Sequence, residues 1–122
     1  MPNFEKLMTS TNNVVMIKNK NKAELKVKFA EARSHGDIVF KDNDELKYSI
    51  VFRNRFGEFK DLVQETSMKN LLTPLSKQDN VVEFGGDTIT LDKGDSVRLK
   101  ITDYLYKERN FEILVLWSEE QA

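Results

Sequence analysis

Apolar and polar residues alternate along most of this chain with a period of two, the pattern of a β-strand with one buried face. The clearest example spans residues 96–101, where Val97 and Leu99 alternate with Arg98 and Lys100. One face of this strand is expected to lie in the core and the other in water. Polar turns rich in Gly, Asp and Asn separate the alternating segments and mark the ends of strands.

A second type of segment is apolar on both faces. In residues 111–117, Phe111 and Trp117 share one predicted face, whereas Leu114 and Leu116 share the other. Such a strand is normally central in its sheet and covered on both sides. The other predicted elements are a strand at 46–53, a shorter strand at 37–40, a hairpin tip at 53–59, polar turns at 41–44 and 107–110, and a loop at 64–80 with one helical turn near 68–72.

Two glycine-containing turns predict hairpins in the C-terminal third. Gly85 and Gly86 lie between two alternating runs, and tight hairpin turns favour glycine because they need positive φ. Gly94 offers the same freedom in the turn at 92–95. The segment 89–99 resembles hairpins of immunoglobulin-like and cupredoxin-like sandwiches, and this resemblance implies a two-sheet architecture. A copper centre of the cupredoxin kind would need Cys and paired His, which the chain lacks.

The segment 22–36 fits two structures. Asn21 and Glu24 form a capping-box pattern, and Gly36 is suited to ending a helix. On a helix, however, the apolar residues would fall on two opposed sides, which a surface helix does not have. On a strand, the segment alternates cleanly up to a phase slip at residues 29–30, which predicts a β-bulge. We therefore favour a strand.

These elements predict an all-β fold, either a two-sheet sandwich or a barrel-like antiparallel meander of about seven to nine strands. The alternative is an α+β fold with one helix at about 22–35. Residues 1–12 are expected to form a polar N-terminal arm that docks on its own domain or on a neighbouring subunit, and residues 13–122 to form a single β-rich domain.

The composition bears on where in the cell the protein is expected. The chain has 122 residues, a formal net charge of −1 and no cysteine. It contains no apolar run of membrane-spanning length and does not begin with a signal-peptide pattern. We therefore expect no membrane association and a cytoplasmic location, or a virion assembled in the cytoplasm.

Charge is distributed unevenly along the chain. Residues 1–36 carry seven Lys and Arg against three Asp and Glu, whereas residues 81–122 carry five against nine. Either the two ends neutralise each other in the fold, or copies of the molecule stack head to tail.

Few residues suit catalysis or metal binding. His35 is the single histidine and lies in a predicted turn, so no nucleophile-and-base pair or His/Cys metal site is expected. Chemistry by carboxylates alone stays open, because Asp and Glu are abundant and their spacing in space cannot be read from the sequence. The sequence favours a protein that is not an enzyme and needs no cofactor.

One stretch interleaves aromatic and basic residues in the way that single-stranded nucleic-acid binders do. The alternative is that its aromatic residues point into the core, which the overall acidic charge favours. The candidate nucleic-acid or partner surface comprises Lys47, Phe52, Arg53, Arg55, Phe56 and Lys60.

The favoured function is that of a non-catalytic structural or protein-binding subunit of a larger assembly, such as a phage or viral particle. Its partners would be other protein subunits or further copies of the chain. Two alternatives stay open: a small single-stranded nucleic-acid-binding protein, and an inhibitor that binds a host or rival protein.

Overall fold

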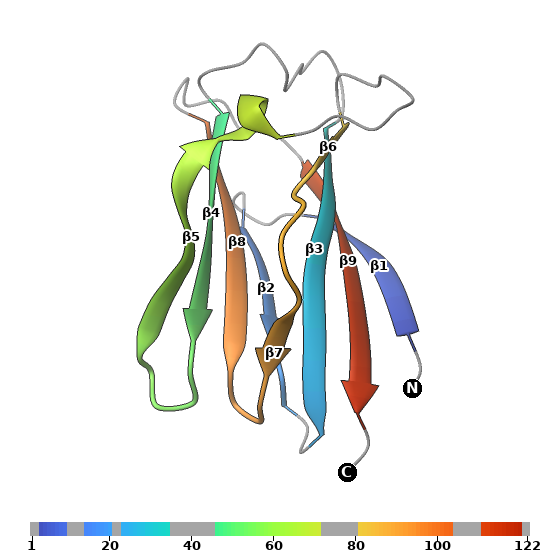
Figure 1. Ribbon diagram of the computed structural model, residues 1–122, viewed down its shortest axis with the longest axis vertical. Coiled ribbons are helices and arrows are strands. Elements are labelled where there is room, and N and C mark those ends of the chain that lie inside the picture. Colours follow the sequence, from blue (N-terminus) through green and yellow to red (C-terminus); the bar gives the residue numbers. More distant parts are fainter. Residues whose placement is uncertain are drawn as a thin grey trace.

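The protein is an all-β sandwich of two antiparallel sheets (Figure 1). The computed structural model describes residues 3–9, 14–20, 23–34, 46–71, 81–103 and 111–120. Its strands are β1 Asn3–Thr9, β2 Val14–Lys18, β3 Glu24–Ser34, β4 Leu46–Arg53, β5 Phe59–Ser67, β6 Val81–Glu83, β7 Ile89–Leu91, β8 Ser96–Asp103 and β9 Phe111–Glu120. The expected strand at 37–40, the turns at 41–44 and 107–110, and His35 lie outside the described residues.

The strands pair in a nested order. β1 pairs with β9, β2 with β8, β3 with both β6 and β7, and β4 with β5, as in a long ribbon folded back on itself. Two further pairings, β3 with β9 and β4 with β8, join this ribbon into sheets with the orders β1-β9-β3-β6 and β2-β8-β4-β5. This is the strand order of a jelly roll. The meander is therefore not the topology, because β1, β2 and β3 alternate between the sheets.

The ambiguous segment of the sequence is strand β3, so the predicted strand is confirmed and the helix at 22–35 is wrong. The register with β9 shifts between Phe29 and Glu31, which leaves Ala30 as a bulge at the predicted phase slip. The N–H of Phe84 donates to the carbonyl of Ala30 at 3.0 Å. This bond continues the pairing of β3 with β6 by one residue beyond the Glu31–Glu83 pair, on the side of β3 away from β9.

The first predicted hairpin, at Gly85 and Gly86, is not one. β6 and β7, on either side of these glycines, both pair with β3. They therefore occupy the same edge of the sheet, and residues 84–88 interrupt the pairing between them. Gly85 has a φ of 61°, which suits an irregular excursion as well as a hairpin turn.

The second predicted hairpin, at residues 92–95, is a corner between the sheets. β7 pairs with β3 in the five-stranded sheet, whereas β8 pairs with β2 and β4 in the other. Turn chemistry predicted the change of direction correctly but could not distinguish a hairpin from a crossing between sheets.

The hairpin tip at 53–59 is confirmed, because β4 and β5 pair with each other on either side of it. The predicted loop at 64–80 begins too early, since β5 continues to Ser67. The expected helical turn is present as the short 3₁₀ helix η1, Met68–Asn70. Ser67 caps it, with its Oγ accepting from the N–H of Lys69 at 3.4 Å.

Part of the expected N-terminal arm is strand β1, which pairs with β9 of the same chain. β9 is therefore flanked by β1 and β3, the central position predicted from its apolar residues. Phe111, Ile113 and Val115 are buried between the sheets, whereas Leu114 and Leu116 lie half-buried on the outer face.

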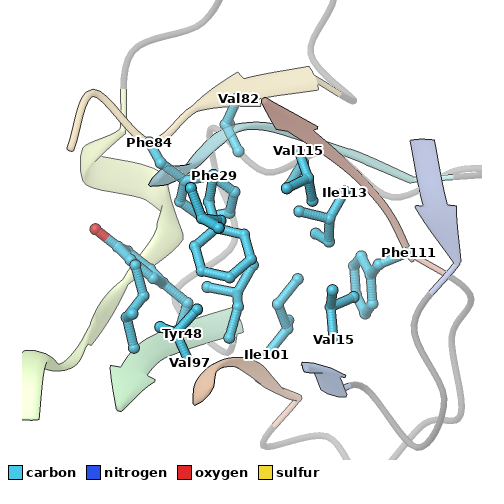
Figure 2. Close-up of a cluster of buried hydrophobic side chains, with 14 of the residues drawn as sticks. Val15, Phe29, Tyr48, Val82, Phe84, Val97, Ile101, Phe111, Ile113 and Val115 are labelled. Carbon is cyan, nitrogen blue, oxygen red and sulfur yellow. The ribbon is translucent and has the colours of Figure 1, made fainter. Parts of the chain in front are cut away.

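The core fills the space between the sheets with alternate residues of both. Figure 2 shows side chains of β3 and β9 meeting those of β4 and β8. Tyr48 packs against Phe84 with ring centroids 5.1 Å apart. Burial raises the pKa of Tyr48 above its usual value, so the phenol stays neutral.

Two buried polar residues join three connections at one end of the sandwich. Asn19 is 3% exposed, and its Nδ2 donates to the carbonyls of Ala23 and Leu91 at 2.8 Å each. Asp95 is 7% exposed, and its carboxylate accepts from the N–H groups of Arg55 and Asp92 at 3.0 Å each.

Backbone bonds tie the same two residues together. The N–H of Asn19 donates to the carbonyl of Asp95 at 2.9 Å, and the N–H of Gly94 donates to the carbonyl of Asn19 at 2.8 Å. We call Asn19 and Asp95 the polar junction, because they connect the β2–β3, β4–β5 and β7–β8 links.

Substitution of the junction carboxylate tests its importance. Asp95→Ala removes the acceptor of two backbone N–H groups and should lower the free energy of unfolding by about 1–3 kcal/mol. The matched control is Asp92→Ala, since Asp92 is exposed, and its change should stay within about 0.5 kcal/mol. Urea denaturation measures both variants, and equal losses would contradict the role of the junction.

Candidate functional site

A track of basic residues runs along the outer face of the four-stranded sheet. Val97, Leu99 and Ile101 of β8 are buried, so the alternate residues Arg98 and Lys100 point outward. The same alternation turns Lys18 of β2 and Lys47 and Arg53 of β4 to this face. Among the described outward-facing residues of β2, β8 and β4, these five are basic and none is acidic.

The register spaces the bases of β4 and β8 evenly. Four successive cross-strand pairs on this face are Lys47 with Thr102, Ser49 with Lys100, Val51 with Arg98, and Arg53 with Ser96. Each pair holds one base, and successive pairs are two residues apart along the strands. Since a strand rises about 3.3 Å per residue, the track extends for about 20 Å.

The five-stranded sheet presents a different outer face. Acids and bases are mixed along β3, where the Nζ of Lys26 lies 4.0 Å from Glu24 and a guanidinium nitrogen of Arg33 lies 3.0 Å from Glu31. The outward residues of this strand therefore carry both signs of charge. Acids border the basic track on the edge strand β5, where Asp61 is the cross-strand neighbour of Val51.

A hollow of about 220 Å³ lies at one end of the track. Lys18, Ser96 and Arg53 form one cross-strand row there, and Arg55 extends it from the β4–β5 turn. Three of the lining residues are basic and none is acidic. The lining residues are Met16, Lys18, Arg53, Asn54, Arg55, Gly57, Gly94 and Ser96.

Two glycines determine how closely the arginines approach this hollow. A Cβ on Gly57 would lie 3.4 Å from a terminal nitrogen of Arg53, and a Cβ on Gly94 would lie 2.8 Å from the Cβ of Arg55. Both glycines have positive φ, at 86° and 91°. A larger residue at Gly94 would therefore be strained and would displace Arg55.

Side-chain and backbone hydrogen bonds fix the turn that carries Arg55. The Oδ1 of Asn54 accepts from the N–H groups of Phe56 and Glu58 at 2.9 Å each. The N–H of Arg55 donates to Asp95 of the polar junction. The turn is thus held both internally and against the corner between β7 and β8.

Two exposed phenylalanines flank the hollow. Phe56 is 73% exposed, and the guanidinium carbon of Arg55 lies 4.7 Å from its ring centroid. Phe59 is 64% exposed, and the guanidinium carbon of Arg53 lies 5.2 Å from its ring centroid. Each ring is a flat apolar surface beside a cation.

The structure divides the six candidate residues of the sequence between two surfaces. Lys47 and Arg53 lie on the track, and Arg55 and Phe56 lie at its end. Phe52 and Lys60 are cross-strand partners on the inner side of the sheet. They line a separate cleft of about 510 Å³ that opens between β5 and β7, together with Ile50, Leu62, Val63 and residues 86–90.

Sequence reasoning missed Lys18, Arg98 and Lys100. The alternation in β8 showed that Arg98 and Lys100 meet water. It could not show that β8 pairs with β4 in a register that places these bases between Lys47 and Arg53.

The described residues contain no group of three or more His, Asp and Glu side chains arranged to hold a metal ion. The described part of the chain also contains no helix with the length and apolar character needed to cross a membrane. No protein-family model matches the chain, and no curated protein matches it significantly.

The close approach of Gly94 to Arg55 predicts a stability difference between two glycines. Gly94→Ala should lower the free energy of unfolding by about 1–3 kcal/mol, because the alanine would adopt positive φ and contact Arg55. Gly86→Ala is the matched control, since a Cβ there meets nothing within 4 Å. Thermal and urea denaturation compare the two variants, and similar stabilities would show that the corner tolerates a side chain.

Proposed function

We propose that this protein binds single-stranded nucleic acid along the outer face of the four-stranded sheet. The observation that carries the proposal is the regular basic track of Lys47, Lys100, Arg98 and Arg53, with no acid among its described outward neighbours on β2, β8 and β4. A row of fixed cations attracts a polyanion and displaces its condensed counterions.

The width of the track supports a single strand over a duplex. The basic residues occupy three neighbouring strands, about 10 Å across, and Asp61 and Glu65 on β5 limit the positive surface on one side. Phe56 and Phe59 are exposed beside the track. Unpaired bases stack on such rings, whereas the bases of a duplex are already stacked on one another.

The overall charge of −1 is compatible with this function. A net acidic balance argues against polyanion binding only if the charges are evenly spread. In this fold the bases of β2, β4 and β8 share one face, and none of the described outward-facing residues of these three strands is acidic. A ligand at the track therefore meets a local positive field.

The proposal predicts salt-sensitive binding to a labelled single-stranded oligonucleotide, measured by fluorescence anisotropy at low and near-physiological salt. The double variant Arg98→Ala, Lys100→Ala should weaken binding at least about tenfold. It should also lower the slope of log affinity against log salt by about 1.4, because two phosphate contacts are lost.

The control is the double variant Lys26→Ala, Lys28→Ala on the outer face of the other sheet. It lowers the net charge by the same amount as the test variant but leaves the track intact. Equal losses of affinity in the two variants would mean that only overall charge matters. No binding by the unsubstituted protein at either salt would refute the proposed function.

A second candidate function is that of a subunit in a larger assembly, as in a phage or viral particle. The observation that favours it is the outer face of β9, where Leu114 and Leu116 are apolar and half-buried on the central strand of the sheet. Jelly rolls form viral capsids as well as lectins, although the fold alone does not determine function.

Light scattering over a range of protein concentrations tests the assembly function. If copies associate through the outer face of β9, the mass should rise with concentration, and Leu114→Lys should reduce this rise. A monomeric mass throughout the range would exclude self-assembly through this face. An inhibitor of another protein would also be monomeric alone, and a partner would then be required to detect its function.

A further inference from the structure

The hollow at the end of the basic track differs from the rest of the track in its construction. Its cations come from two separate parts of the chain: Lys18 from β2, and Arg53 and Arg55 from the end of β4 and the turn that follows it. The remainder of the track is an open surface on which each cross-strand pair of β4 and β8 carries one basic residue. A ligand in the hollow would therefore meet side chains from more than one strand and from the turn, whereas a ligand on the track would lie over an open surface.

Both arginines have contacts that restrict them. The guanidinium of Arg53 lies against Phe59 and beside Gly57, and the guanidinium of Arg55 lies against Phe56. A guanidinium that is already oriented loses less entropy when it binds an anion than a free side chain does. The arrangement favours a ligand at a fixed position over diffuse attraction.

The chemistry of the lining matches a tetrahedral oxyanion. Guanidinium groups donate paired N–H bonds to phosphate, the ammonium of Lys18 supplies a further charge, and Ser96 offers a hydroxyl donor. No carboxylate lines the hollow, and its volume of about 220 Å³ admits a phosphate group with part of its hydration shell.

We propose that this hollow binds a phosphate group and thereby anchors the end of a nucleic-acid strand that lies along the track. Phosphate binding in the hollow does not depend on the proposed function. The source of the phosphate, a nucleic-acid strand, does rest on it. Phe56 and Phe59 stand beside the hollow, so a strand anchored there would place its nearest bases against these rings.

The first test uses inorganic phosphate alone. Titration of the isotope-labelled protein at constant ionic strength should give saturable NMR shift changes in the amides of Arg55, Gly57, Gly94 and Ser96. The double variant Lys18→Ala, Arg53→Ala should weaken this binding at least about tenfold, because it removes two charged donors. The same spectra report whether the variant is folded.

The control is again the double variant Lys26→Ala, Lys28→Ala, which removes the same amount of charge from the outer face of the other sheet and leaves both the track and the hollow intact. It should bind phosphate as the unsubstituted protein does. Equal weakening in both double variants, or no saturable change in the unsubstituted protein, would overturn the phosphate site. If the Lys18→Ala, Arg53→Ala variant is unfolded, the single variant Ser96→Ala takes its place and should weaken phosphate binding measurably.

The second test identifies the source of the phosphate with two oligonucleotides of the same sequence, one with a 5′-phosphate and one with a 5′-hydroxyl. Tighter binding of the phosphorylated strand, lost in Lys18→Ala, Arg53→Ala, would indicate a terminal phosphate. Equal binding of the two, with the same loss in the variant, would indicate an internal phosphodiester.

The two proposals fail separately. Binding of inorganic phosphate without oligonucleotide binding would leave the hollow as an anion site and refute the nucleic-acid function. Oligonucleotide binding that is unchanged in Lys18→Ala, Arg53→Ala would support the track and refute the anchoring role of the hollow.

Discussion

The links between strands at one end of the sandwich depend on the buried hydrogen bonds of Asn19 and Asp95, the polar junction. Apolar packing between two sheets is strong but non-directional, so by itself it allows the sheets to slide. A buried carboxylate or amide has no such freedom, because each atom that loses its partner costs free energy. These two residues therefore fix how the links between strands lie relative to each other.

The same constraint positions the candidate site. Asp95 binds the backbone of Arg55, and Gly94 beside it leaves space for the Cβ of that arginine. Ser96, which begins β8, lines the hollow one residue further on. Arg55 of the hollow thus belongs to a turn held on rigid neighbours, whereas Lys18 and Arg53 are on strands, and such supports keep a binding geometry without a ligand.

Alternation along the sequence was sufficient to predict the strands at Leu46–Arg53 and within Glu24–Ser34, including the bulge at Ala30. It was insufficient for the pairing, because a period of two says which face a residue occupies and nothing about the neighbouring strand. Local turn chemistry therefore predicts hairpins at both Gly85 and Gly94, although Gly85 interrupts the edge of a sheet and Gly94 lies in a corner between the two sheets. Nested pairing is a long-range property, and local turn chemistry does not encode it.

The candidate site shows the same division between local and long-range information. Arg53, Arg55 and Phe56 are close in sequence, and their mixture of charge and aromatic rings was visible there. Arg98 and Lys100 join them only because β8 inserts between β2 and β4. The net charge of the sequence has a related limit, because a sum over the chain cannot tell whether opposite charges are neighbours in the fold. On β3 they are, as the Arg33–Glu31 pair shows, and such a pair has little field left for a ligand. On β8 the bases have no described acid beside them on β2 or β4, and their field extends into solvent.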